Sequence, residues 1–173
     1  PEVVKDFKTF GIPVYLGYGL TECSPLVIGN NDRIELPDSV GVPLPGVEAK
    51  IINADASGVG EICVKGPMVM LGYYNDPEAT AEVLDEDGFF HTGDLGTVDE
   101  NGYYRITGRI KNVIVTKNGK NIYPEEVEYY LNKNPFVAES IVVGEDEDDE
   151  TMVTAKVFPN VEAIREKLKQ SSV

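Results

Sequence analysis

The stretch from Val40 to Arg105 constrains the fold more than any other part of the sequence. It consists of short runs of alternating apolar and polar residues, for example at 49–52, 61–64 and 102–106, and Gly, Pro and Asp separate these runs. Such a pattern is typical of short strands that tight turns connect into an antiparallel sheet. The sequence therefore predicts a small antiparallel β subdomain at about residues 40–107.

Helical patterns occur inside and around this stretch. Asp76 is a good N-cap residue, and Pro77 and Glu78 suit the first turn of a helix. A helix is predicted at the start of the chain, where Val3, Val4, Phe7 and Phe10 recur at helical spacing. Further helices are predicted from Pro124 through Asn132 and from Asn160 onward.

Strands are predicted on both sides of the β subdomain. Residues 12–16 form a short apolar strand that leads into a glycine-flanked loop. Residues 113–115 and 121–123 form a hairpin, because Asn118-Gly119 supplies the positive φ angles of a tight turn. Residues 137–143 and 152–158 form two further strands, which the acidic run 145–150 connects in solvent. The fold class is therefore α+β, and a domain boundary is predicted near residues 108–112, after the β subdomain.

Composition excludes several function classes. The 173 residues include 15 Lys+Arg and 30 Asp+Glu, a net charge of −15, and no basic stripe offsets it. Nucleic acid is therefore not expected as a partner. No apolar run approaches a membrane span and no secretory leader is apparent, which predicts a cytoplasmic protein and leaves peripheral membrane contact open. Cys23 and Cys63 lie far apart in the sequence with only His91 to help, so we expect reduced, packed thiols rather than a metal cluster.

Three segments concentrate polar residues in glycine-rich surroundings: residues 18–22, 91–96 and 108–112. Tyr18, between two glycines, could stack on a base. Thr21 could contact a phosphate oxygen and Glu22 could ligate Mg²⁺. Asp94 could accept hydrogen bonds from a ribose diol, and Arg109 has a planar fork for a diol or phosphate. Together these residues would suit a Mg²⁺-bound purine nucleotide.

Each residue also has an ordinary structural explanation. Tyr18 could be a half-buried core aromatic, Asp94 could accept backbone amides in a turn, and Arg109 could pair with a surface carboxylate. Other catalytic motifs are absent from the sequence: it has no GxxxxGK[ST] phosphate loop and no GxSxG, and its single His disfavours a Ser/His/Asp hydrolase. His91 fits a structural or supporting role. The residues alone leave a nucleotide site as one of two interpretations.

The three segments resemble motifs of the adenylate-forming superfamily, which contains acyl-CoA synthetases, peptide synthetase adenylation domains and luciferases. GYGLTECSP is similar to the family's adenine and Mg²⁺ motif, and VGVPLPG, GEICVKGPMVMLGYYNDPEAT and GFFHTGDLG follow in the family's order. GRIKNVIVTKNGKNIYPEEVE is similar to the hinge and the start of the mobile C-terminal domain. The sequence around Lys111 and Asn121 resembles that of bacterial long-chain fatty acid–CoA ligases. Peptide synthetases usually have Asp at the position of Lys111 and Arg near the position of Asn121.

The resemblance implies a set of roles. Tyr18 and Gly19 would lie against the adenine, Thr21 would contact the α-phosphate of ATP, and Glu22 would bind Mg²⁺. Asp94 would hold the ribose with help from Arg109. Lys111 would be the hinge, and the loop at Gly119 would face the active site in the second step and help to form the passage for coenzyme A.

The resemblance also implies a domain organisation and a reaction. Residues 1–108 would be the last part of the large AMP-binding domain, 109–112 the hinge and 113–173 part of the small C-terminal domain. The chain would thus be a fragment of a longer enzyme, which we call the parent. The parent enzyme would join a fatty acid to ATP and pass the acyl group to coenzyme A. The fragment is expected to be inactive, since the phosphate loop and catalytic lysine have no match in it. Two alternatives remain: an enzyme that loads a carrier-protein thiol, and a non-catalytic nucleotide-binding or interaction module.

Overall fold

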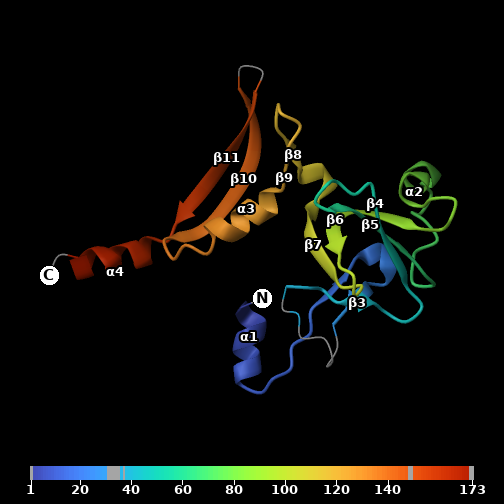
Figure 1. Cartoon of the computed structure of the whole chain (residues 1–173), viewed down its shortest axis with the longest axis horizontal. Coiled ribbons are helices and arrows are strands. Elements are labelled where there is room, and N and C mark those ends of the chain that lie inside the picture. The colour runs from blue at the N-terminus through green and yellow to red at the C-terminus, as the bar shows by residue number, and fades with distance from the viewer. Residues whose placement is uncertain (1, 31–35, 37, 148–149, 172–173) are drawn as a thin grey trace. The chain divides into compact units, whose positions relative to one another are not determined.

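The computed structural model describes residues 2–30, 36, 38–147 and 150–171. Helices account for 24% and strands for 39% of the chain, which confirms the α+β class. The chain divides into two compact units, Pro1–Thr107 and Gly108–Val173 (Figure 1). We describe each unit by itself.

The larger sheet of the first unit has four strands in the order β4 (Glu48–Ile52), β5 (Gly60–Lys65), β6 (Phe90–Val98) and β7 (Tyr104–Arg109). Both β4 and β6 are antiparallel to β5, as the alternating pattern predicted. The predicted helix is α2 (Pro77–Val83), and the Asp76 carboxylate accepts a hydrogen bond from the backbone N–H of Ala79. The predicted N-cap is therefore confirmed.

The smaller sheet of the first unit contains β1 (Gly17–Gly19), β2 (Leu26–Gly29) and β3 (Val42–Pro43). It follows helix α1 (Glu2–Thr9), which matches the predicted N-terminal helix. The prediction of a strand at 12–16 was wrong, because pairing begins only at Gly17, opposite Gly29. Pro13 has no N–H to donate to a ladder, and the Leu16 carbonyl accepts the Asn30 N–H at 2.9 Å just before the ladder begins.

The core of the first unit draws side chains from both sheets. Its buried members are Cys23, Val27, Ile28, Ile62, Val64, Phe90 and Tyr104. Removing each large apolar side chain from water contributes about 1.5–3 kcal/mol, so this cluster joins the two sheets strongly. Cys23 and Cys63 are both buried and free, which agrees with the predicted packing of their thiols. Because the sheets pack together, a residue of β1 can contact a residue of β6.

The second unit contains two antiparallel hairpins and two helices. Its elements are the short 3-10 helix η2 (Ile110–Asn112), β8 (Ile114–Val115), β9 (Asn121–Ile122), α3 (Pro124–Leu131), β10 (Val137–Glu147), β11 (Glu150–Pro159) and α4 (Val161–Ser171). The predicted first hairpin is present, but only Gly119 of the Asn118-Gly119 pair takes a positive φ, of 72°. Its N–H donates to the Thr116 carbonyl at 2.8 Å, and the Thr116 N–H donates to the Lys120 carbonyl at 3.0 Å. The connection is therefore a three-residue loop, 117–119, instead of the predicted two-residue turn.

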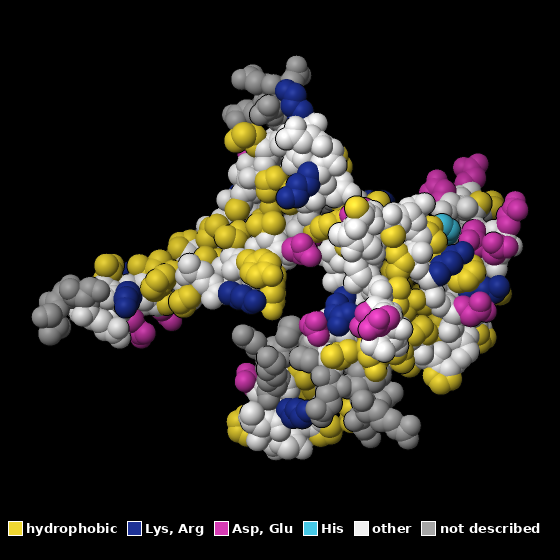
Figure 2. All heavy atoms as spheres, in the orientation of Figure 1, with side chains coloured by type: hydrophobic (Ala, Val, Ile, Leu, Met, Phe, Trp, Pro, Cys, Tyr) yellow, Lys and Arg dark blue, Asp and Glu magenta, His cyan; other side chains and the backbone are white. Residues whose placement is uncertain are grey.

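The long hairpin of the second unit extends beyond its predicted limits. The ladder between β10 and β11 runs from Val137 and Pro159 to Glu147 and Glu150, so the acidic run is partly strand and Asp148 and Asp149 lie outside the described residues. Hydrophobic side chains gather on the visible face of α3, β10, β11 and α4 (Figure 2). Tyr130, Phe158 and Leu168 are among the exposed ones.

Candidate functional site

The centre of the candidate site is the segment from Gly17 to Cys23, which forms β1 and the short 3-10 helix η1 (Thr21–Cys23). A side chain at Gly19 would collide with the Pro25 backbone, since an added Cβ would lie 1.7 Å from its carbonyl oxygen. Glycine is therefore required here by the close approach of β1 and β2. The short segment 18–22 beside this approach carries three candidate site residues: Tyr18, Thr21 and Glu22.

Tyr18 reaches across to the larger sheet. Its ring is half-buried and packs against the core cluster, and its hydroxyl donates to Asp94 Oδ2 at 2.6 Å. Burial and the hydrogen bond to Asp94 raise the pKa of the Tyr18 hydroxyl, so the phenol keeps its proton and remains the donor. This contact brings together two residues that the sequence had placed in separate segments.

Asp94 lies in a local irregularity of β6. His91 is opposite Cys63 and Leu95 is opposite Glu61, so β6 places three residues where β5 has one. Such a bulge re-aims side chains and is common beside active sites. Within it the Thr92 hydroxyl accepts the Asp94 N–H at 3.0 Å and donates to the Ile62 carbonyl at 2.7 Å. The Asp94 side chain is only 7% exposed, so its carboxylate is held at a defined position.

Glu22 has a partner that the sequence analysis had not named as a site residue. The hydroxyl of Tyr73 donates to Glu22 Oε1 at 3.1 Å, and burial and this hydrogen bond raise the pKa of that phenol. The Glu22 carbonyl also accepts the Met70 N–H at 2.7 Å. Tyr73 belongs to the GYYNDPEAT stretch, but nothing in the local pattern indicates which distant side chain its hydroxyl meets.

The chemistry of these groups suits a nucleotide and a hard cation. A carboxylate can accept about four hydrogen bonds, so Asp94 retains the capacity to bind a diol beside Tyr18. Glu22 is partly exposed and offers the oxygen donor that Mg²⁺ prefers. Thr21 is exposed and its hydroxyl can donate to a phosphate oxygen. The side chains of Asp94, Glu22 and Thr21 therefore fit both a nucleotide and Mg²⁺.

The remaining predicted residues follow Thr107, the last residue of the first unit. Strand β7 crosses this division, so its last residue, Arg109, counts in the second unit. Arg109 is exposed at the end of β7, Lys111 is exposed in η2, and Gly119 is exposed in the turn between β8 and β9. Lys111 follows the division between the units by four residues. The structure brings together Tyr18 with Asp94 and Glu22 with Tyr73, and it leaves Arg109, Lys111 and Gly119 in a separate unit.

The chain is similar in sequence and structure to known enzymes. Residues 1–74 match the model of the AMP-binding enzyme family. The long-chain-fatty-acid–CoA ligase of Salmonella typhimurium is 46% identical over 134 residues, which cover 74% of this chain and 24% of that protein. A probable 4-coumarate–CoA ligase of Dictyostelium discoideum is 47% identical over 149 residues, which cover 83% of this chain and 27% of the relative.

The structural matches extend into the second unit. The ATP-bound MatB of Rhodopseudomonas palustris matches with a TM-score of 0.82 and 38% identity, over 92% of this chain and 33% of that one. The O-succinylbenzoate–CoA synthetase of Bacillus subtilis, in complex with ATP and magnesium, matches with a TM-score of 0.83 and 32% identity, over 92% of this chain and 34% of that one.

The chain belongs to the adenylate-forming superfamily. The resemblance noted in the sequence is therefore confirmed, and the chain spans about a quarter of the length of the curated ligases that it matches. Among the described residues, no helix combines the length and apolar character that crossing a membrane requires.

Proposed function

We propose that the parent adenylate-forming enzyme activates a fatty acid and transfers it to coenzyme A. In the first step a fatty acid carboxylate oxygen attacks the α-phosphorus of ATP, and the bond to pyrophosphate breaks, which gives the acyl-adenylate. In the second step the thiol of coenzyme A attacks the acyl carbon, loses its proton, and displaces AMP. The identity to long-chain-fatty-acid–CoA ligases supports this choice of substrates.

The hydrogen bond between Tyr18 and Asp94 carries the proposal. It fixes the buried Asp94 carboxylate at 2.6 Å from the Tyr18 hydroxyl. Tyr18 lies within residues 1–74, which match the family model, and Asp94 lies in GFFHTGDLG, which resembles a later motif of the superfamily. In this role Asp94 accepts the ribose hydroxyls while the Tyr18 ring lies against adenine. Orienting the nucleotide in this way lowers the entropic cost of aligning the α-phosphorus with the attacking carboxylate.

Thr21 and Glu22 would act next to the phosphates. The Thr21 hydroxyl donates to an α-phosphate oxygen, where negative charge develops during the transfer. Glu22 would hold Mg²⁺ through its carboxylate, and Tyr73 would fix the orientation of that carboxylate by its hydrogen bond. When bound, the cation neutralises phosphate charge.

The second unit would contribute to both steps. Arg109 assists at the ribose hydroxyls, and Lys111 is the hinge on which residues 113–173, the start of the small domain, change position between the steps. The turn at Gly119 would then help to form the passage for the pantetheine arm of coenzyme A. The exposed positions of Lys111 and Gly119 support these roles.

The acid and the acceptor are the least constrained parts of the proposal. The 4-coumarate–CoA ligase relatives suggest an aromatic acid as the second candidate. A carrier-protein thiol is an alternative acceptor of the acyl group. One structural match, an amide bond synthetase of Marinactinospora thermotolerans, is named for a different product, so the fold alone does not fix the acceptor. A cytoplasmic location, a role in fatty acid metabolism and peripheral contact with a membrane belong to the same proposal.

We also propose that the 173-residue chain by itself does not adenylate an acid. No Ser/Thr/Gly-rich phosphate loop occurs in its sequence. Lys167 and Lys169 lie on α4 and not in a glycine-containing loop. Pyrophosphate release from ATP by this purified chain would contradict this proposal.

Exchange of radiolabelled pyrophosphate into ATP tests the function of the full-length parent. We expect exchange with long-chain fatty acids and acyl-CoA as the product, identified by mass spectrometry. Exchange with 4-coumarate but not fatty acids would reassign the substrate and keep the adenylation step. Absence of exchange with every carboxylic acid tested would overturn the proposed function and favour a non-catalytic nucleotide-binding module.

A further inference from the structure

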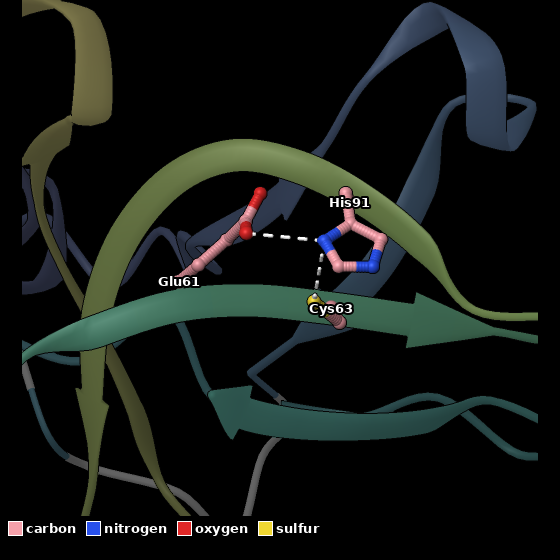
Figure 3. A group of neighbouring side chains, drawn as sticks. All are labelled: Glu61, Cys63 and His91. Carbon is pink, nitrogen blue, oxygen red and sulfur yellow. Dashed lines mark hydrogen bonds and ion pairs between the residues drawn. The ribbon is translucent and has the colours of Figure 1, made fainter. Parts of the chain in front are cut away.

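A second cluster of reactive side chains lies in the larger sheet of the first unit. Ile62 and Val64 of β5 point into the core cluster, and the intervening position, Cys63, points to the other face together with Glu61. His91 of β6 is the cross-strand partner of Cys63. Figure 3 shows the side chains of Glu61, Cys63 and His91 directed toward one another.

The ring nitrogen Nδ1 of His91 is the common point of the cluster. It lies 3.1 Å from Glu61 Oε2 and 3.7 Å from Cys63 Sγ, and the three donor atoms are all within 4.8 Å of one another. One nitrogen carries at most one proton, which cannot serve the carboxylate and the sulfur equally well. A cation could bind all three atoms at once.

The two separations from His91 Nδ1 fit a tetrahedral zinc ion. With Zn–S of about 2.3 Å and Zn–N and Zn–O of about 2.0–2.1 Å, tetrahedral donors lie about 3.6 Å apart for N and S and about 3.3 Å apart for N and O. The observed separations of 3.7 and 3.1 Å differ from these values by no more than a few tenths of an ångström.

Asp85 provides an independent observation. Its Oδ2 lies 3.7 Å from Nε2, the other ring nitrogen of His91, and 3.8 Å from Nζ of Lys50. A histidine that ligates a metal usually directs its second N–H at a carboxylate, which fixes the tautomer. If Nδ1 bound a cation, the ring proton would reside on Nε2 and face Asp85. At 3.7 Å Asp85 is an ion-pair neighbour of Nε2 and not hydrogen-bonded to it, but it lies on the side of the ring where a metal site has its outer carboxylate.

We propose that Glu61, Cys63 and His91 bind a thiophilic divalent cation, for which Zn²⁺ is the best match, with a water as fourth ligand. On binding, the Cys63 thiol releases its proton to solvent as the metal–sulfur bond forms, and neutral His91 donates the Nδ1 lone pair. The His91 and Glu61 side chains are 29% and 13% exposed, so the cation enters from their side although Cys63 is fully buried. Glu22 is not among these ligands.

The same site is linked to the bulge that carries Asp94. Glu61 Oε1 accepts the Gly93 N–H at 3.0 Å, while Oε2 faces His91. A cation bound to Oε2 would fix the orientation of the Glu61 carboxylate. The other oxygen, Oε1, would then hold Gly93, the residue before Asp94, in place. Metal binding would therefore stabilise the bulge.

Titration of the full 173-residue chain with Cd²⁺, in excess Mg²⁺ to saturate nonspecific carboxylates, tests the proposal. We expect one equivalent to produce the ultraviolet absorption of a cadmium–thiolate bond, and Zn²⁺ to abolish that absorption by competition. Cys63→Ala should eliminate the band, and His91→Gln and Glu61→Gln should each weaken binding at least tenfold. Asp85→Asn should weaken it roughly ten- to hundredfold, as loss of an outer carboxylate does.

Cys23→Ala is the matched control, because Cys23 is also fully buried and free but lies outside the cluster. This variant should retain the band. Circular dichroism checks that each variant is folded, and His91→Gln and Glu61→Gln keep the test valid if Cys63→Ala unfolds. No thiolate band in the wild-type chain, a band lost in Cys23→Ala, or an unchanged affinity in both His91→Gln and Glu61→Gln would overturn the proposal.

Discussion

The candidate site residues of the two units differ in how the fold holds them. In the first unit, Tyr18 and Asp94 hold each other at 2.6 Å and Tyr73 holds Glu22 at 3.1 Å. In the second unit, Lys111 and Gly119 lie at the surface in a short 3-10 helix and a turn. Preorganised polar groups lower the cost of binding, whereas exposed connecting segments can change conformation. In the proposed function, the first unit would therefore hold the nucleotide and the second would move.

The largest effect is expected from Asp94→Ala in the full-length parent. Loss of a charge-assisted acceptor for the ribose hydroxyls should reduce kcat/KM for ATP. The expected loss of transition-state stabilisation is about 1.5–3 kcal/mol. Steady-state adenylation kinetics measure this effect. Asp87→Ala, which removes an exposed carboxylate from a turn, is the control and should leave the kinetics unchanged. Equal kinetics for wild type and Asp94→Ala would refute the assignment.

Tyr18→Phe tests whether the first unit is held together at this contact. The variant leaves the buried Asp94 carboxylate without one donor, so the free energy of unfolding should fall by about 1–2 kcal/mol. Urea denaturation of the 173-residue chain measures the change. Tyr130→Phe removes an exposed hydroxyl of the second unit and should have no effect. An unchanged stability of Tyr18→Phe would mean that the hydrogen bond contributes nothing to the fold.

Lys111→Pro tests movement of the second unit. Proline fixes φ at position 111 and restricts Ile110 before it, so the thioester step should slow at least tenfold, about 1.4 kcal/mol, while pyrophosphate exchange persists. Single-turnover assays of the parent separate the two steps. Lys111→Ala keeps a flexible backbone and should slow the second step less. Equal loss of both steps would argue against a hinge at this position.

The smallest effect is expected from Tyr73→Phe. The lost hydrogen bond to Glu22 lies at the surface, where water replaces it, so we expect the Mg²⁺ concentration for half-maximal rate to rise only a few-fold, about 0.5–1 kcal/mol. Magnesium titration of the adenylation rate detects this shift. The neighbouring Tyr74→Phe, at a side chain that is 93% exposed, provides the comparison. A similar shift in both variants would remove Tyr73 from the site.

Local signals in the sequence predicted most of the elements. Asp76 and Pro77 marked the start of α2, and alternation located β4 and β5, because capping and strand burial depend on neighbours only a few residues away. The errors arose where pairing decides the outcome. Residues 12–16 are apolar but have no described strand partner, and the ladder of β10 and β11 continues into acidic residues because backbone hydrogen bonds tolerate any side chain.

The sequence by itself therefore determined the α+β class, the turns and caps, and the motifs that indicated a nucleotide. The tertiary structure decided which of these residues meet. Tyr18 and Asp94 are 76 residues apart and Glu22 and Tyr73 are 51 apart, and only the packing of two sheets on one core brings them into contact. Strand register placed His91 beside Cys63, because a shift by one residue would send either side chain to the opposite face.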